Sequence, residues 1–243
     1  PPPPIFFYTT TPPSALLRSL VGSERCIRDR DSLGLYNLKN VHRNLSVSEL
    51  VDDIVNNKEG LIGLRGAAMV DTGIYTGRSP QDKYIVDEPA SNEKLWWGPV
   101  NKKISEDIFD MLYGKITDYY NSTNHTKTYV FDGFAGADPN YSLNVRIIAK
   151  KAWQAHFVNN MFIRPKNGEL GEFKPGFTII NASDVSNERF DEFGMNSETF
   201  IIFHMEKRIA IIGGTEYGGE MKKGIFSVLH YLLPQEGVLS MHC

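Results

Sequence analysis

The 243-residue sequence is poor in cysteine and has no long apolar run, and both absences narrow the class of protein. Its two cysteines, Cys26 and Cys243, stand near opposite ends, which is typical of a reducing compartment rather than of a disulfide framework. No apolar run approaches the roughly 18–20 residues of a membrane helix. The formal net charge of -3 comes with neither a basic stripe nor an acidic tail. We expect a cytoplasmic globular protein that binds neither nucleic acid nor a membrane.

Several common catalytic signatures are also absent. The sequence contains no G-x-x-x-x-G-K-[ST] phosphate loop, no dinucleotide-binding fingerprint, no H-E-x-x-H and no C-x-x-C. Its function must therefore be inferred from other segments.

The first 36 residues differ in character from the rest. They open with four prolines and carry no basic region before an apolar run, so they do not read as a signal peptide. The segment Ser14–Arg30 is similar to peptides produced when sequencing-library adapters are translated by mistake. We predict that residues 1–36 are a non-native or disordered leader and that residues 37–243 form one domain.

Hydrophobic periodicity predicts strands interleaved with helices in the remainder, and hence a mixed α/β sheet. Ser46 and Glu49 form a capping box that begins a helix, and Asn56-Asn57 ends it. Further helices are expected over 105–120 and 220–232. Strands are expected over 128–131, 143–148, 177–180, 199–205 and 208–212, with Glu206-Lys207 turning the last two into a hairpin.

The segment Gly213–Gly224 (GGTEYGGEMKKG) combines glycines with charge at a helix start. Glycines let the backbone approach a ligand closely, and the first N–H groups of a helix can bind an anion. Lys222 and Lys223 are expected in the first helical turn, where the macrodipole disfavours a cation; such a departure from local preference is typical of functional sites. The field would favour a neutral amine, which can act as a base or a metal ligand. A pair of solvated surface lysines is the alternative.

Two further residues are candidates for binding chemistry. Arg78 lies between Gly77 and Ser79-Pro80, in a turn that proline stiffens. Its planar guanidinium suits bidentate capture of a carboxylate or phosphate, although an ordinary surface arginine is the alternative. His242 could bind a metal through a neutral ring nitrogen, or be structural. The residues alone indicate an anion-binding α/β domain.

Six segments, in order, resemble the ATP-dependent phosphoenolpyruvate carboxykinases. They are Tyr75–Tyr84 (YTGRSPQDKY), Phe134–Ala137 (FAGA), Ala152–Pro165 (AWQAHFVNNMFIRP), Ile211–Lys223 (IIGGTEYGGEMKK), Tyr231–Pro234 (YLLP) and Ser240–Cys243 (SMHC). The similarity runs from about Leu61 to the last residue. It implies the mixed-sheet amino-terminal domain of that fold, with the nucleotide-binding domain and its phosphate loop missing.

The resemblance implies a role for each matching residue. Arg78 would hold the oxaloacetate carboxylate and the departing CO2, and Tyr217 would pack against the substrate carboxylate. Lys223 would contact the substrate and ligate a catalytic Mn²⁺ (or Mg²⁺), with His242 beside it in the shell of that metal and near the terminal phosphate of ATP. Arg78, Lys223 and His242 would then be the catalytic residues.

The family reaction converts oxaloacetate and ATP to phosphoenolpyruvate, ADP and CO2, a carboxy-lyase step of gluconeogenesis. We expect that the 243-residue chain does not turn over, because it has no phosphate loop. A non-catalytic anion-binding remnant of the same domain is the second hypothesis. A structural domain with coincidental glycines and lysines is the third.

Overall fold

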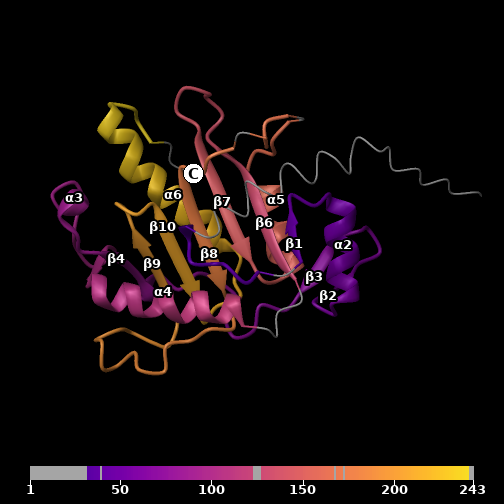
Figure 1. Ribbon diagram of the computed structural model, residues 1–243, viewed down its shortest axis with the longest axis horizontal. Coiled ribbons are helices and arrows are strands. Elements are labelled where there is room, and N and C mark those ends of the chain that lie inside the picture. Colours follow the sequence, from indigo (N-terminus) through magenta and orange to yellow (C-terminus); the bar gives the residue numbers. More distant parts are fainter. Residues whose placement is uncertain (1–31, 39, 123–126, 167, 172, 241–243) are drawn as a thin grey trace, which may run out of the picture.

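An eight-stranded mixed sheet forms the centre of the protein in the computed structural model (Figure 1). The structure describes residues 32–38, 40–122, 127–166, 168–171 and 173–240. The strands of this sheet are β1 (Val41–Arg43), β4 (Lys83–Val86), β5 (Lys102–Ile104), β6 (Thr128–Ala135), β7 (Leu143–Ala149), β8 (Phe177–Ala182), β9 (Phe200–His204) and β10 (Ile209–Gly213). A separate two-stranded sheet pairs β2 (Gly60–Ile62) with β3 (Ala68–Val70).

Helices connect and cover these strands. They are α2 (Val47–Asn56), α3 (Pro89–Asn92), α4 (Glu106–Asn121), α5 (Ala152–Met161) and α6 (Gly219–Leu232), with 3-10 turns η1 (Pro80–Asp82) and η2 (Leu233–Glu236). The predicted mixed α/β class is confirmed. Among the described residues, no helix combines the length and the apolar character that crossing a membrane requires.

The strand order in the large sheet is β1-β6-β7-β8-β10-β9-β4-β5. The central strands β7, β8 and β10 run parallel to one another. β9 pairs antiparallel with β10 through the predicted hairpin, and β4 and β5 follow the direction of β9. β6 pairs antiparallel with β7, so the sheet changes direction there and again between β10 and β9. The second change matters for the site described below.

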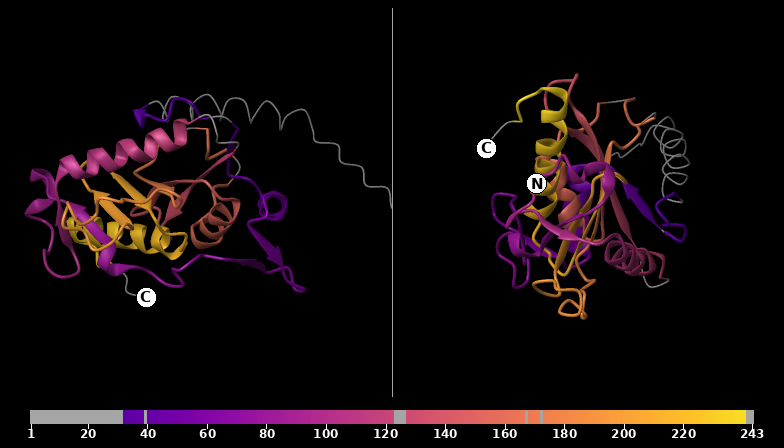
Figure 2. Two further views of the ribbon diagram at one scale, coloured as in Figure 1. Left: turned by 90° about the horizontal axis from the view of Figure 1, so that it is seen from below. Right: turned by 90° about the vertical axis from the view of Figure 1, so that its left-hand side faces the viewer.

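Helices lie on both faces of the sheet, with α4 on one side and α5 and α6 on the other (Figure 2). Consecutive isoleucines of one strand point into opposite layers: Ile180 packs with the α4 layer, whereas Ile179 packs with the layer that contains α6. The pairs Ile201-Ile202 and Ile211-Ile212 divide between the two layers in the same way. Because both faces are buried, the central strands read as continuous apolar runs.

The predicted capping box at the start of α2 is confirmed. The Ser46 side chain accepts a hydrogen bond from the Glu49 N–H, and the Glu49 carboxylate accepts one from the Ser46 N–H at 2.8 Å. Leu50 and Ile54 of this helix then pack against Trp153 of α5. The cap therefore fixes a helix that supports α5 from the outside.

Residues 1–31, which make up most of the predicted leader, lie outside the described residues. Leu33 and Leu35 are described and are buried in the core cluster on the α4 side. The Asn37 side chain donates a hydrogen bond to the Asn121 carbonyl at 2.8 Å. The domain boundary at residue 37 stays a prediction.

A buried ion cluster joins the three strands at the β1 edge. Asp132 of β6 is 0 % exposed and accepts two hydrogen bonds from Arg146 of β7, at 2.7 Å and 2.8 Å. Arg43 of β1 contacts the same carboxylate at 2.6 Å. A buried carboxylate needs this degree of pairing because its desolvation is costly.

We predict that Asp132→Asn lowers the free energy of unfolding by about 3–5 kcal/mol, because it removes the charge that offsets two guanidinium groups. Urea titration followed by circular dichroism measures this quantity. Asp87→Asn is the matched control: it removes the carboxylate of an exposed pair with Lys103 and should cost about 1 kcal/mol or less. An Asp132→Asn variant as stable as the Asp87→Asn variant would contradict the prediction.

Candidate functional site

The candidate site forms at the edge of the sheet where β10 ends. Gly213, the last residue of β10, lies opposite Phe200, the first residue of β9. Lys83, the first residue of β4, lies opposite Ile201. The loop before β4 and the loop after β10 therefore meet at one edge, although about 130 residues separate them in sequence. Ligands of open α/β sheets bind at such edges.

Close packing explains the glycines after β10. A methyl group on Gly213 would lie 2.3 Å from the Phe200 ring, and one on Gly218 would lie 3.0 Å from the Phe157 ring. Gly214 adopts φ +72°, which favours glycine. These glycines bring the loop against β9 and α5.

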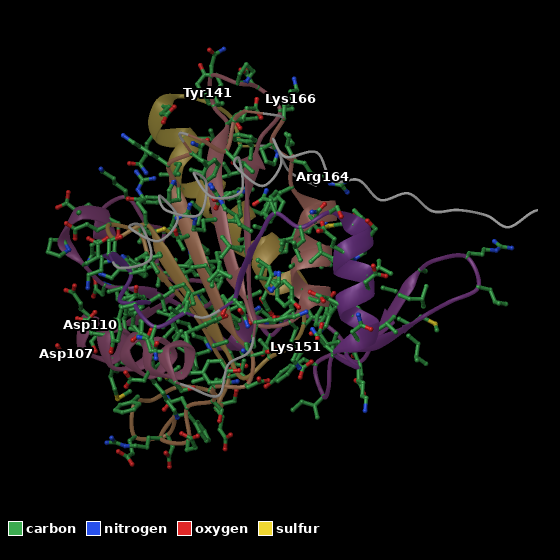
Figure 3. All side chains as sticks on the ribbon, turned by 45° about the vertical axis from the view of Figure 1, so that its right-hand side comes forward. Asp107, Asp110, Tyr141, Lys151, Arg164 and Lys166 are labelled. Atoms are coloured by element: carbon green, nitrogen blue, oxygen red, sulfur yellow. The ribbon has the colours of Figure 1, made fainter. Side chains whose placement is uncertain are left out.

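The loop between β10 and α6 is also tied to the start of α5. The Lys151 ammonium pairs with Glu216 and lies 3.9 Å from Asp184. Figure 3 shows Lys151 at the start of α5, at the opposite end of the sheet from Tyr141. Lys151 is thus engaged with carboxylates and serves to hold this loop.

Side-chain hydrogen bonds anchor the loop that carries Arg78. The Thr199 hydroxyl lies 2.8 Å from the Tyr75 hydroxyl and 3.0 Å from the Gly214 carbonyl oxygen. The buried Asp82 carboxylate accepts hydrogen bonds from the Ser79 hydroxyl and, at 2.9 Å, from the Ser197 hydroxyl. The loop is therefore held at both ends against the site edge.

Glu220, the second residue of α6, connects this loop to the helix. The residue is 6 % exposed, and its carboxylate accepts a hydrogen bond from the Ser79 N–H at 2.6 Å. Burial raises the pKa of Glu220; the Ser79 hydrogen bond, Arg78 and Lys83 oppose that shift, whereas Asp82 adds to it. A carboxylate that is costly to ionise thus stands between two cations.

A small hollow brings the charged residues together. Arg78, Lys83, Glu220 and Lys223 line it, over an apolar floor that includes Phe203. Burial lowers the pKa of Lys83, and the positive charge of Arg78 lowers it further, while Glu220 raises it. The hollow therefore has three cationic side chains and one carboxylate, which suits an anionic ligand.

Two of the four predicted site residues line the same hollow. Arg78 from the loop and Lys223 from α6 are brought together, and Lys222 is exposed. Tyr217 lies just before α6 with its ring against Gly219, where a methyl group would come within 2.4 Å of the ring. His242 lies outside the described residues.

The start of α6 differs from the prediction by one residue. The helix begins at Gly219, so Lys222 and Lys223 are its fourth and fifth residues rather than members of its first turn. The macrodipole effect weakens beyond the first turn. The N–H groups of Glu220 and Met221 donate to the carbonyls of Tyr217 and Gly218, both at 3.2 Å, and are not free to bind an anion. Anion binding by the remaining N–H groups of the helix start stays a prediction, and cationic side chains line the hollow beside it.

The described part of the chain contains no group of three or more His, Cys, Asp or Glu residues that could hold a metal ion. The Lys223 ammonium lies 4.4 Å from the centre of the Phe226 ring, a cation–π contact within its own helix. The described residues therefore do not by themselves form a metal centre. Metal binding by Lys223 and His242 stays a prediction.

Sequence reasoning missed Lys83 and Glu220 as site residues. Both lie inside segments that were recognised, five residues after Arg78 and three residues before Lys223. A glutamate in a first helical turn is ordinarily explained by the macrodipole, and a lysine next to a loop by solvation. The Ser79–Glu220 hydrogen bond and the hollow that Lys83 and Glu220 line show that they meet.

Comparison with known proteins agrees with this geometry. The family model described as phosphoenolpyruvate carboxykinase matches residues 39–243. The chain belongs to the ATP-dependent phosphoenolpyruvate carboxykinase family. It is 55 % identical over 203 residues to the phosphoenolpyruvate carboxykinase (ATP) of Leptospira biflexa serovar Patoc, which covers 84 % of this chain and 38 % of that protein.

Other carboxykinases match to a similar extent. The phosphoenolpyruvate carboxykinase (ATP) of Sulfurimonas denitrificans is 46 % identical over 217 residues, covering 89 % of this chain and 40 % of that protein. The enzyme of that name from Geobacillus kaustophilus is 48 % identical over 204 residues, covering 84 % and 38 %. The chain thus spans about two fifths of the length of these relatives.

The raised pKa of Glu220 predicts a pH-dependent stability. Because the folded state holds this proton more tightly than the unfolded state, the contribution of Glu220 is fully present below pH 4.5 and is lost as the pH rises through the raised pKa. The Glu220→Gln variant does not titrate at this position. We expect the melting temperature of the wild type to fall relative to that of Glu220→Gln as the pH rises above 4.5 in thermal unfolding. A difference that stays constant with pH would contradict this.

Proposed function

We propose that this chain is the substrate-anion-binding part of an ATP-dependent phosphoenolpyruvate carboxykinase. The reaction would be oxaloacetate and ATP to phosphoenolpyruvate, ADP and CO2, a carboxy-lyase step of gluconeogenesis in the cytoplasm. The observation that carries the proposal is the hollow where Arg78 and Lys223 meet, since both belong to segments that resemble the family. Its second support is the family match over residues 39–243.

Arg78 is assigned to the substrate carboxylate. Its guanidinium projects from an exposed loop position whose backbone is held by Asp82 and Glu220 through Ser79. A planar guanidinium group on a fixed backbone suits bidentate binding of a carboxylate. Tyr217, whose ring lies against Gly219 at the start of α6, would pack against the same ligand.

Lys223 and Lys83 are assigned to stabilising the negative charge that develops on the substrate during the reaction. Loss of CO2 from oxaloacetate leaves an enolate, and cationic groups fixed near its oxygen lower the barrier. The apolar floor of Phe203 reduces solvation in the hollow, which strengthens these interactions. Lys83 is an addition to the residues that the resemblance indicates.

The cofactors follow from the family. ATP would be the co-substrate, and Mn²⁺ or Mg²⁺ would bind at Lys223 and His242, where it would act as a Lewis acid toward the enolate oxygen. The described residues do not complete such a donor set, so this assignment rests on the resemblance.

For the 243-residue chain by itself, anion binding without turnover is the second candidate. The chain spans 38 % of the length of the Leptospira biflexa relative and contains no phosphate-loop motif. Without that motif, no segment of this sequence is recognisable as a cradle for the ATP phosphates.

We predict that Arg78→Ala and Lys223→Ala each weaken phosphoenolpyruvate binding at least about tenfold, because each removes a charge-assisted contact. Isothermal titration calorimetry on the purified chain, with and without Mn²⁺, measures the affinity. Lys222→Ala is the matched control: it removes the same charge from the neighbouring, exposed position and should change the affinity less than about twofold.

Two results would contradict this assignment. Equal losses in Lys222→Ala and Lys223→Ala would indicate unspecific attraction by positive charge. Full affinity in Arg78→Ala would remove the loop from the binding site.

We also predict that the purified 243-residue chain forms no ATP from phosphoenolpyruvate, ADP and bicarbonate, in a coupled assay with Mn²⁺ and Mg²⁺. The reason is the lack of a phosphate loop in this sequence. Turnover by the purified chain would show that other residues position the nucleotide.

A further inference from the structure

A single carboxylate links the two elements that carry the cations of the site. Glu220 accepts the Ser79 N–H at 2.6 Å across 141 residues of sequence. Ser79 is the neighbour of Arg78, and Glu220 lies three residues before Lys223 on the same helix. Residues three apart share one helix face, so Glu220 and Lys223 both face the hollow. The position of Arg78 relative to Lys223 is therefore transmitted through this contact.

The two carboxylates that hold Ser79 have different tasks. Asp82 accepts the Ser79 hydroxyl and contacts Asn196 and Ser197, both at 2.9 Å, so it fixes the loop to the segment before β9. Glu220 instead accepts the Ser79 backbone and belongs to α6. Asp82 thus anchors the loop to the sheet edge, whereas Glu220 sets its distance from the helix.

Stability alone does not account for a carboxylate at this position. Glu220 is 6 % exposed, and burial disfavours its ionised form. The charged groups that face it are Arg78, Asp82 and Lys83 from the loop and β4, and Lys223 from its own helix. An uncharged side chain with an oxygen acceptor could keep the Ser79 hydrogen bond at a lower desolvation cost. The negative charge of Glu220 is therefore better explained by its attraction to the cations that it faces.

We propose that Glu220 is a positioning residue: it fixes the separation between Arg78 and Lys223 and so sets the affinity for a small anion with two acidic groups. The inference rests on the proposed function for its ligand, a carboxylate-bearing phosphate or keto acid. The tether between loop and helix rests on geometry alone.

Amide hydrogen exchange, measured by nuclear magnetic resonance on the full chain, tests the tether. In Glu220→Ala the Ser79 amide should exchange about tenfold faster or more, because it loses a charged acceptor. In Glu220→Gln, which keeps an oxygen acceptor without the charge, the increase should be about fivefold. The Ile211 amide in the core strand β10 should keep its exchange rate in both variants. Glu236→Gln, which removes an exposed carboxylate and changes the net charge equally, is the control.

Phosphoenolpyruvate titration of the same proteins tests the positioning role. We expect the affinity to fall about tenfold in Glu220→Ala and severalfold in Glu220→Gln, and to change less than about twofold in Glu236→Gln. In the Arg78→Ala background, removal of Glu220 should cost little further affinity, because a positioning residue acts through the group it positions.

The outcomes separate the two ideas. An unchanged Ser79 exchange rate in Glu220→Gln overturns the tether, whatever the chain binds, and that variant stays informative if Glu220→Ala does not fold. Faster exchange with unchanged affinity overturns the positioning role and leaves a purely structural contact. A wild-type chain that binds no phosphoenolpyruvate overturns the proposed function and the affinity role with it, while the exchange data still decide the tether.

Discussion

β9 and β10 pair antiparallel beside a group of parallel strands, with Gly213 opposite Phe200. This reversal brings the start of β4 to the same edge as the end of β10, because β4 follows the direction of β9. An all-parallel arrangement would carry the start of β4, and the Arg78 loop before it, to the opposite end of the sheet. The meeting of loop and helix at the candidate site depends on this one change of direction.

Charge burial takes two forms in this molecule. Asp132 is surrounded by two guanidinium groups and belongs to the framework that joins β1, β6 and β7. Glu220 has cations near it but accepts its 2.6 Å hydrogen bond from a backbone N–H, and burial raises its pKa. The two guanidinium groups offset the desolvation cost of the Asp132 carboxylate, whereas the desolvation cost of the Glu220 carboxylate is offset less completely. Such incompletely compensated groups gather at functional sites more often than in frameworks.

The sequence predicted elements where local signals are strong. The Ser46 cap and the hairpin at Glu206-Lys207 depend on neighbouring residues and were correct. The helix expected over 105–120 was also correct, although periodicity does not fix its buried face: Phe109 is buried, whereas Met111 is exposed. Short strands such as β4 were missed, because four residues between a loop and a turn show too little alternation to identify.

The residues of the candidate site also divide into those that the sequence identifies and those that only the structure reveals. Arg78, Tyr217 and Lys223 stand in recognisable segments, and the structure brings Arg78 and Lys223 to one hollow. Lys83 and Glu220 became visible only through contacts between distant segments. Gly224 shows why the depth of the hollow escapes sequence reasoning: a methyl group there would lie 3.2 Å from the Phe203 ring, so glycine lets α6 approach the sheet. That close approach sets Lys223 above the same floor as Lys83, where the positive charge of Arg78 already lowers the pKa of Lys83. An anion in the hollow would relieve the repulsion among these cations, which the single carboxylate of Glu220 relieves only in part.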